Sequence, residues 1–321
     1  MPSPTEATGG TDDHTDHGTE GISDALLRGA REHLDDGQRY EQGGDCGRAL
    51  ASYLSALDAG ATLPEQAEAR LRAARVHRTC ARWDDAVRES REAVRLADAV
   101  GSDDLAAEAM NVEVGVHQLR GDFGAGHALA EQALARARSP RIRGILLQNR
   151  GAMAARAGDL ATAERFFSES VEAFRAADYQ LGIAIALNNA AAAACDGGSA
   201  DRAIALATEA AAIARRIDAA DVLVLATQNH AQALVELDRL DEAEAMLWQT
   251  LGHFATTGNQ LRQAECLEIL GELHARRPEC RDEAVRCYER ARTLAQSVGD
   301  RLLCDRIAHA LAGLGVDEAA C

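Results

Sequence analysis

The sequence contains no lysine, and all 34 of its Lys and Arg positions are arginine. A chain without lysine cannot use a P-loop lysine, a Schiff-base lysine or a lysine general base. The G-x-S-x-G motif of hydrolases and the H-E-x-x-H motif of zinc peptidases are also absent. We therefore expect no catalytic residue and no cofactor, although an enzyme with its site inside a groove of the fold is an alternative.

The sequence also lacks the closely spaced cysteine pairs of metal sites and the long apolar stretches of membrane spans. None of the eight cysteines forms a C-x-x-C pair, so we expect reduced, mostly buried thiols and no metal site. No stretch approaches the roughly 18 uninterrupted apolar residues of a membrane span. The N-terminus has no basic segment followed by an apolar run, which would indicate a signal peptide. These features favour a cytoplasmic protein with no membrane partner.

Positive charge and aromatic residues are both scarce. The chain has 51 acidic residues and a formal net charge of −17, and this field repels nucleic-acid phosphates. We therefore expect no direct nucleic-acid partner. Aromatic residues make up 3% of the chain, whereas 47% is hydrophobic, mostly alanine, leucine, valine and isoleucine. This composition favours helices that pack closely against one another.

A stretch rich in carboxamides recurs at a fixed period. Asn149, Asn189 and Asn229 are spaced 40 residues apart, and each directly follows a second amide, at Gln148, Asn188 and Gln228. A fixed period of this size is typical of a repeat array.

Small residues recur with a similar period over a longer part of the chain. Each follows a short polar turn such as Gly158-Asp159, in which glycine ends one helix and the acidic residue caps the next. A small side chain allows the two helices of a pair to cross closely. At intervals of 37 to 41 residues these anchors are Ala49, Ala86, Gly126, Ala163, Ala203, Ala243 and Ala284.

These patterns predict an all-α fold of about seven helix–turn–helix repeats, followed by one capping helix from Asp300 to about Leu314. We expect a disordered polar tail over residues 1–22, the repeat array over 23–314 and a short tail over 315–321.

The repeats resemble tetratricopeptide repeats. The clearest units carry Gly158-Asp159-Leu160 with Ala163, and Ile269-Leu270-Gly271 with Tyr288 and Ala291. The repeats are longer than the family's usual length of about 34 residues. In this they are similar to the sensor regions of bacterial regulators of the maltose-activator type. However, the chain lacks the Walker motif and the basic recognition helix of such regulators.

The resemblance implies a right-handed α-solenoid whose first helices line a concave groove. By alignment, the groove would present Gln148, Asn149, Asn188, Asn189, Gln228 and Asn229. A carboxamide has donors and an acceptor, so a row of amides can hold an extended peptide backbone. The same amides could instead bond the neighbouring helix and stabilise the stack. Arginines in first helices, among them Arg72, Arg75, Arg150 and Arg262, are further candidates, as clamps for a carboxylate.

The resemblance therefore implies a non-enzymatic scaffold or adaptor that binds a protein segment or peptide. The alternative is a regulatory protein that senses a peptide or small molecule and acts on a transcription factor. The sequence does not define an oligomeric state.

Overall fold

The computed structural model describes residues 17–316, with side chains from residue 29 onward. Within these residues there are fifteen α-helices, one short 3-10 helix and no strand. The predicted all-α helical-repeat solenoid is confirmed, since seven consecutive helix pairs precede one single helix. The first helix begins at His17, inside the range predicted to be a tail; the rest of that tail and residues 317–321 lie outside the described residues. No described helix is long and apolar enough to span a bilayer.

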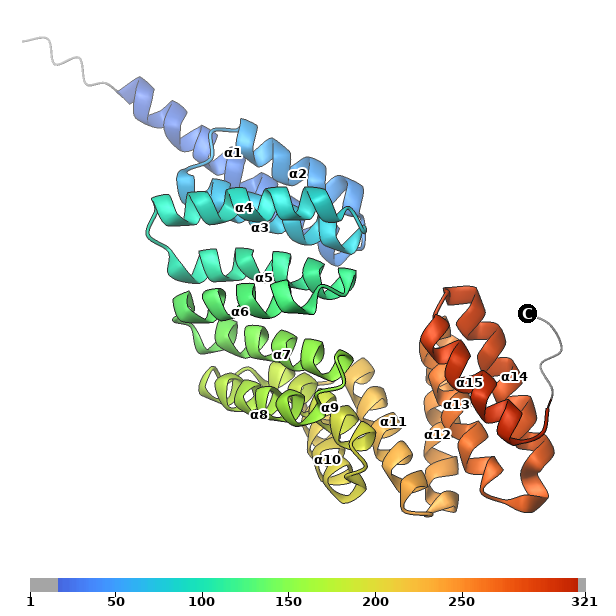
Figure 1. Ribbon diagram of the computed structural model, residues 1–321. Coiled ribbons are helices and arrows are strands. Elements are labelled where there is room, and N and C mark those ends of the chain that lie inside the picture. The colour runs from blue at the N-terminus through green and yellow to red at the C-terminus, as the bar shows by residue number, and fades with distance from the viewer. Residues whose placement is uncertain (1–16, 317–321) are drawn as a thin grey trace, which may run out of the picture. The chain divides into compact units, whose positions relative to one another are not determined.

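The chain divides into two compact units, with the boundary between Val116 and His117. In the first unit, Tyr53 is fully buried and donates a 2.6 Å hydrogen bond from its hydroxyl to Glu41, while Leu34 and Val76 complete the same core. The helices of this unit are α1 (His17–Gln42), α2 (Cys46–Asp58), α3 (Leu63–Thr79), α4 (Trp83–Ala99) and most of α5 (Asp103–Arg120) (Figure 1).

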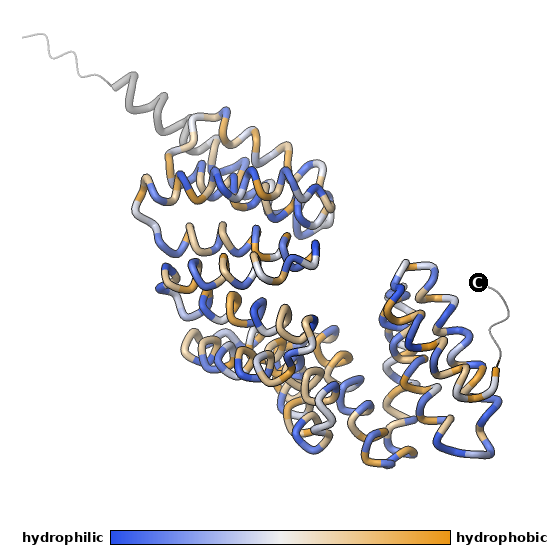
Figure 2. The backbone as a smooth tube through the Cα atoms, viewed as in Figure 1, coloured by the Kyte–Doolittle hydropathy of each residue, from blue (hydrophilic) through white to orange (hydrophobic). Residues whose placement is uncertain are grey.

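The second unit continues the pairs and ends with the single helix α15. Its helices are α6 (Phe123–Arg136), α7 (Pro140–Arg156), α8 (Leu160–Ala176), α9 (Gln180–Asp196), α10 (Ala200–Arg216), α11 (Ala220–Glu236), α12 (Leu240–Thr256), α13 (Gln260–Ala275), α14 (Arg281–Val298) and α15 (Arg301–Gly313), with the short helix η1 (Pro278–Cys280) before α14. Hydrophobic and hydrophilic residues alternate along these helices, as expected when one face of each is buried (Figure 2).

The helix ends follow the turn chemistry predicted from the sequence. At the end of α7, Gly158 has a left-handed φ of 81° and the amide of Asp159 donates to the carbonyl of Ala154 at 2.9 Å. This is the hydrogen bond of a glycine-terminated helix. The Asp159 carboxylate then accepts from the amide of Thr162 at 3.1 Å and caps α8.

The small anchors lie where helices cross. All six alanine anchors are completely buried. At the seventh anchor, Gly126, an added Cβ would lie 2.6 Å from Sδ of Met153 and 3.3 Å from Cβ of His117. A larger residue would therefore separate α6 from its neighbours, which is the steric reason for the pattern.

The first helices of successive pairs form the tighter layer in the second unit. Helix α9 lies against α7 and α11, α11 also lies against α13, and α13 lies against α15. Among the described residues, no comparable approach joins α8 to α10 or α10 to α12. Since the more closely spaced layer of a curved stack lies on its inner side, α7, α9, α11, α13 and α15 form the concave side of this unit.

Candidate functional site

A cavity of about 410 Å³ opens on this concave side, and we call it the polar cavity. It is built by α9, α11, α13 and α15, and it contains two of the predicted amides, Gln228 and Asn229. Nine of its eleven lining residues are polar or charged. The lining consists of Ala192, Asp196, Gln228, Asn229, Gln232, Arg262, Glu265, Glu268, Ile269, Glu272 and Arg306.

One predicted amide joins neighbouring helices. Nδ2 of Asn229 on α11 donates to the carbonyl oxygen of Asn188 at 3.1 Å and to its side-chain Oδ1 at 2.9 Å on α9. In return, Sγ of Cys195 on α9 donates to the carbonyl oxygen of Asn229 at 3.5 Å. Asn229 therefore stabilises the stack, and it also lines the polar cavity.

The other predicted amides do not gather in this cavity. Gln148 and Asn149 are half-buried on α7, and Asn189 is half-buried on α9. Asn188 is only 8% exposed and serves Asn229. The cavity thus lies at the first helices of the fifth to seventh pairs and at α15, whereas the predicted amides belong to the first helices of the fourth to sixth pairs.

Gln228 is the most buried polar residue of the cavity. Its side chain is 5% exposed, and its Oε1 has no hydrogen-bond partner among the described residues. A buried acceptor without a donor costs about 1–3 kcal/mol. Such groups are rare in folded proteins, so Gln228 holds an unused acceptor that is buried in the wall of the cavity.

The cavity wall is acidic, with four carboxylates and two guanidinium groups. Arg306 on α15 binds Glu268 on α13 through two hydrogen bonds, of 2.8 and 2.6 Å. Arg262 donates to Glu265 at 2.7 Å, so both guanidinium groups are already paired. Within the described residues, no cation lies within ion-pair distance of Asp196.

Removal of water from these carboxylates perturbs their titration. Desolvation raises the pKa of Asp196, although nearby Arg306 opposes the shift. Desolvation also raises the pKa of Glu268 against the effect of its partner Arg306. Beside the cavity, the pKa of Glu236 is raised by desolvation and by the negative charges of Glu272 and Asp196. The site therefore has an excess of negative charge, with Asp196 and Glu272 at its exposed rim and Glu268 half-buried in its wall.

The sequence reasoning missed these acidic residues, although a signal was present. Asp196 and Glu236 each follow a predicted amide, Asn189 or Asn229, by seven residues. Seven residues are close to two helical turns, so each acid lies on the same helix face as its amide. The carboxamide pattern therefore extends into an acidic pattern at the C-terminal ends of α9 and α11.

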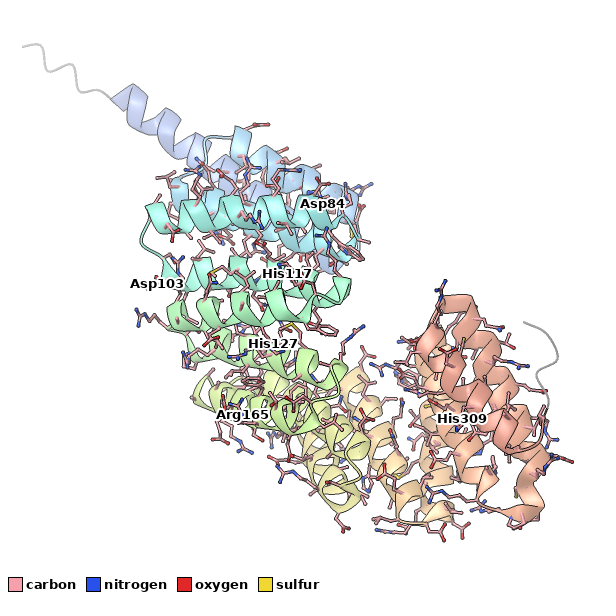
Figure 3. The ribbon with its side chains drawn as sticks, viewed as in Figure 1. Asp84, Asp103, His117, His127, Arg165 and His309 are labelled. Atoms are coloured by element: carbon pink, nitrogen blue, oxygen red, sulfur yellow. The ribbon has the colours of Figure 1, made fainter. Side chains whose placement is uncertain are left out.

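The predicted arginine candidates already have partners. Arg72 donates to Glu68 at 3.0 Å and Arg75 to Glu108 at 2.7 Å. Arg150 on α7 stacks on the ring of Phe166 at 4.2 Å, toward the second helices rather than into the polar cavity. Figure 3 labels two further charged or titratable residues of the second unit, His127 on α6 and Arg165 on α8.

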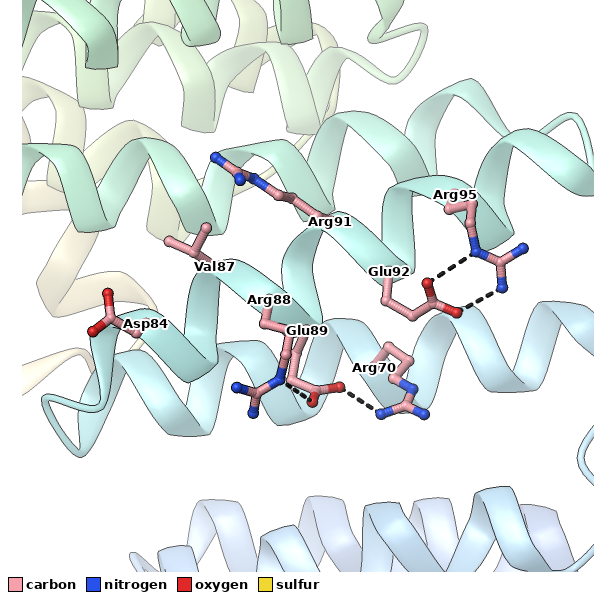
Figure 4. A pocket seen from close by; sticks show the side chains of 8 residues that line it. All are labelled: Arg70, Asp84, Val87, Arg88, Glu89, Arg91, Glu92 and Arg95. Atoms are coloured by element: carbon pink, nitrogen blue, oxygen red, sulfur yellow. Dashed lines mark hydrogen bonds and ion pairs between the residues drawn. The ribbon is translucent and has the colours of Figure 1, made fainter.

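A larger cavity, of about 700 Å³, lies in the first unit against α4 and Arg70 of α3 (Figure 4). Its arginines are engaged with carboxylates of the same unit. Arg70 donates to Glu89 at 2.7 Å, and Arg95 forms two hydrogen bonds with Glu92. The other two pairs are Arg88 with Asp85 and Arg91 with Glu113. Each arginine of this surface is thus paired with a carboxylate of the same unit.

Cysteine and histidine do not form a metal centre in the part of the chain that the structure describes. No group of three or more His, Cys, Asp or Glu side chains there has an arrangement that could hold an ion. Cys195 and Cys266 are buried, and desolvation raises the pKa of each thiol to about 12. Both thiols are therefore protonated at neutral pH.

Solved structures of other helical-repeat proteins share this fold at low sequence identity. A Signal Transduction ATPase with Numerous Domains from Pyrococcus horikoshii, which has a tetratricopeptide repeat sensor, gives a TM-score of 0.68 at 11% identity. The match covers 90% of this chain and 46% of that chain. A Rap protein in complex with competence and sporulation factor gives 0.60 at 13% identity, with 92% and 79% covered.

A tetratricopeptide repeat protein from Parabacteroides merdae gives a TM-score of 0.55 at 10% identity, with 89% of this chain and 99% of that chain covered. No protein-family model matches the sequence, and the sequence comparison with curated proteins gives no match. The chain therefore has the tetratricopeptide-repeat fold, an all-α helical-repeat solenoid with a resemblance to sensor arrays.

Proposed function

We propose that the protein is a non-enzymatic interaction module that binds an extended protein segment or peptide along α9, α11, α13 and α15. The observation that carries this proposal is the polar cavity, to which four successive inner helices contribute side chains. Its volume of about 410 Å³ lies in the range of ligand sites, roughly 300–1,000 Å³. Because its lining is mostly polar, it suits a peptide better than an apolar small molecule.

The amides supply a means of holding a backbone without reading its side chains. Asn229 uses Nδ2 to bind α9, but its Oδ1 remains available to a ligand. Gln232 lies one helical turn further along α11 and adds both donors and an acceptor. The predicted ladder of Gln148, Asn149 and Asn189 would continue the track toward α7.

A sensor that passes on the presence of a peptide is the second candidate. The Pyrococcus horikoshii protein has a tetratricopeptide repeat sensor, and the Rap protein was solved with competence and sporulation factor. These similarities support a regulatory role, because an array of this fold is the sensor of one of these proteins and the other was solved with a bound factor. In this chain the effector would be a transcription factor or another protein.

Selection of random-sequence peptides against the full chain tests the proposal. Dissociation constants of the selected peptides are then measured by fluorescence anisotropy. We expect Asn229→Ala and Gln232→Ala each to weaken binding by about threefold to tenfold, the loss of one neutral hydrogen bond. Gln249→Ala, an exposed residue on the second helix α12, is the matched control. Failure to select any peptide, or equal affinities for all variants, would refute the proposal.

A further inference from the structure

The polar cavity has two unused features that point to the same kind of ligand group. The first is the unpaired carboxylate of Asp196, the last residue of α9, whose negative charge acts on Glu236, the last residue of α11. Helix C-termini carry partial negative charge, so these positions favour a nearby cation. Among the described residues, neither carboxylate has a cationic partner within ion-pair distance.

The second feature is the orphan acceptor of Gln228. This residue is 5% exposed, so its polar group has been removed from water without a compensating donor. A ligand that brings an N–H group would satisfy it. The feature is independent of the acidic residues, because an amide oxygen is neutral and is set on a different turn of α11 from Glu236.

A carboxylate and an amide oxygen together favour a ligand group that donates hydrogen bonds and accepts none. Arginine and lysine side chains carry several N–H donors, no acceptor and a positive charge. Hydrogen bonds between such a cation and a carboxylate are stronger than neutral ones. An acidic side chain or a free C-terminal carboxylate would instead meet Asp196, Glu268 and Glu272 and be repelled.

We propose that the polar cavity is the subsite for an arginine or lysine side chain of the bound segment. Asp196 pairs with the cation, Gln228 accepts one of its N–H groups, and Arg306 and Arg262 remain bound to Glu268 and Glu265. This inference rests on the proposed function and gives it a specificity: the protein reads one basic residue and holds the rest of the segment by its backbone.

A positional-scanning library of acetylated, amidated hexapeptides tests the proposal on the full chain, with affinity measured by fluorescence anisotropy. We expect mixtures with arginine or lysine at one defined position to bind about tenfold more tightly than mixtures with glutamine there. Asp196→Asn should remove most of this preference. Glu131→Gln, which removes an exposed acidic charge on α6, should leave it unchanged.

Gln228→Met provides a second variant that is not expected to compromise folding. It removes the unsatisfied acceptor, so the free protein should melt at a higher temperature while the preference for a basic residue falls. A stabilising effect alone, with the preference intact, would show that Gln228 takes no part in recognition and would overturn its assigned role.

The remaining outcomes separate the two proposals. Hexapeptides that bind without preference for arginine or lysine would overturn the subsite and leave the proposed function standing. Absence of binding by every mixture would overturn both. Competition by spermidine in the micromolar range would assign the cavity to a free polycation and overturn the basic-segment subsite.

Discussion

At the residue scale, glycines on first helices determine how closely the two helices of a pair approach. A Cβ added to Gly271 on α13 would lie 2.7 Å from Cε1 of Tyr288 on α14. The same relation holds in the pair α7 and α8, where a Cβ at Gly151 on α7 would lie 2.6 Å from Cε1 of Phe167 on α8. In both pairs a flat ring fills the space that the missing side chain leaves.

Gly271→Ala should therefore destabilise the protein. Tyr288 is 5% exposed and its ring is rigid, so the backbone must move to admit the methyl group. We expect a loss of about 1–3 kcal/mol in the free energy of unfolding, the usual cost of overpacking. Urea unfolding followed by circular dichroism measures it.

Gly252→Ala on α12 is the control for this substitution. No atom lies within 4 Å of a Cβ at Gly252, which is exposed and helical. Alanine has the better helix propensity, so this variant should gain up to about 1 kcal/mol. Equal effects at the two positions would contradict the steric account.

At the element scale, α15 has two roles on adjacent faces. Leu303, Ile307 and Leu311 recur at helical spacing, are at most 3% exposed and cover the last pair. Arg306 projects from the same helix to Glu268 and completes the wall of the polar cavity. The capping helix predicted from the sequence is thus also part of the candidate site.

A double-mutant cycle on Arg306 and Glu268 tests this coupling. The Glu268 side chain is 20% exposed and its pKa is raised by desolvation, so Arg306→Ala leaves a poorly hydrated carboxylate unpaired. We expect Arg306→Ala to lower the free energy of unfolding by more than the double replacement by alanine does. The coupling energy should be about 1 kcal/mol, because Arg306 is half-exposed. Additive losses in urea unfolding would show that the ion pair does not support α15.

Periodicity predicted the helices well because each repeat must present the same buried face. The turn at Ala81 lacks the glycine signal, yet this residue has a left-handed φ of 56° like the glycines of the other turns. The start of α1 was harder, because residues 17–22 carry no apolar period that would indicate a helix.

The polar cavity was only partly predictable, for a geometric reason. Gln228 and Asn229 follow from the 40-residue period, and Glu268 occupies the next position of that period after Gln228, but Arg306 belongs to the single helix α15 and meets Glu268 only in the folded stack. The choice between ligand binding and stacking also depends on rotamers. The bond from Asn229 to Asn188 settles the stacking role of that one amide and leaves its remaining acceptor to the cavity.

At the scale of the whole molecule, the division at Val116 separates two surfaces of different character. In the first unit, α4 carries ion pairs that are satisfied internally, such as Arg95 with Glu92. In the second unit, the polar cavity retains an unpaired acid and an unused acceptor. The proposed binding site therefore lies in the second unit, and under the sensor hypothesis the first unit is a candidate for carrying the response.

Hydrogen exchange on the full chain, with and without an arginine-containing hexapeptide mixture, distinguishes an adaptor from a sensor. Binding stabilises only those openings that disrupt the site, so amides of α9, α11, α13 and α15 should exchange more slowly. An adaptor leaves exchange in α1–α4 unchanged, since none of their residues lines the polar cavity. A sensor alters it, because a ligand that shifts a conformational equilibrium changes the stability of every element that differs between the two states. Protection confined to α1–α4 would contradict both and place the peptide site in the first unit.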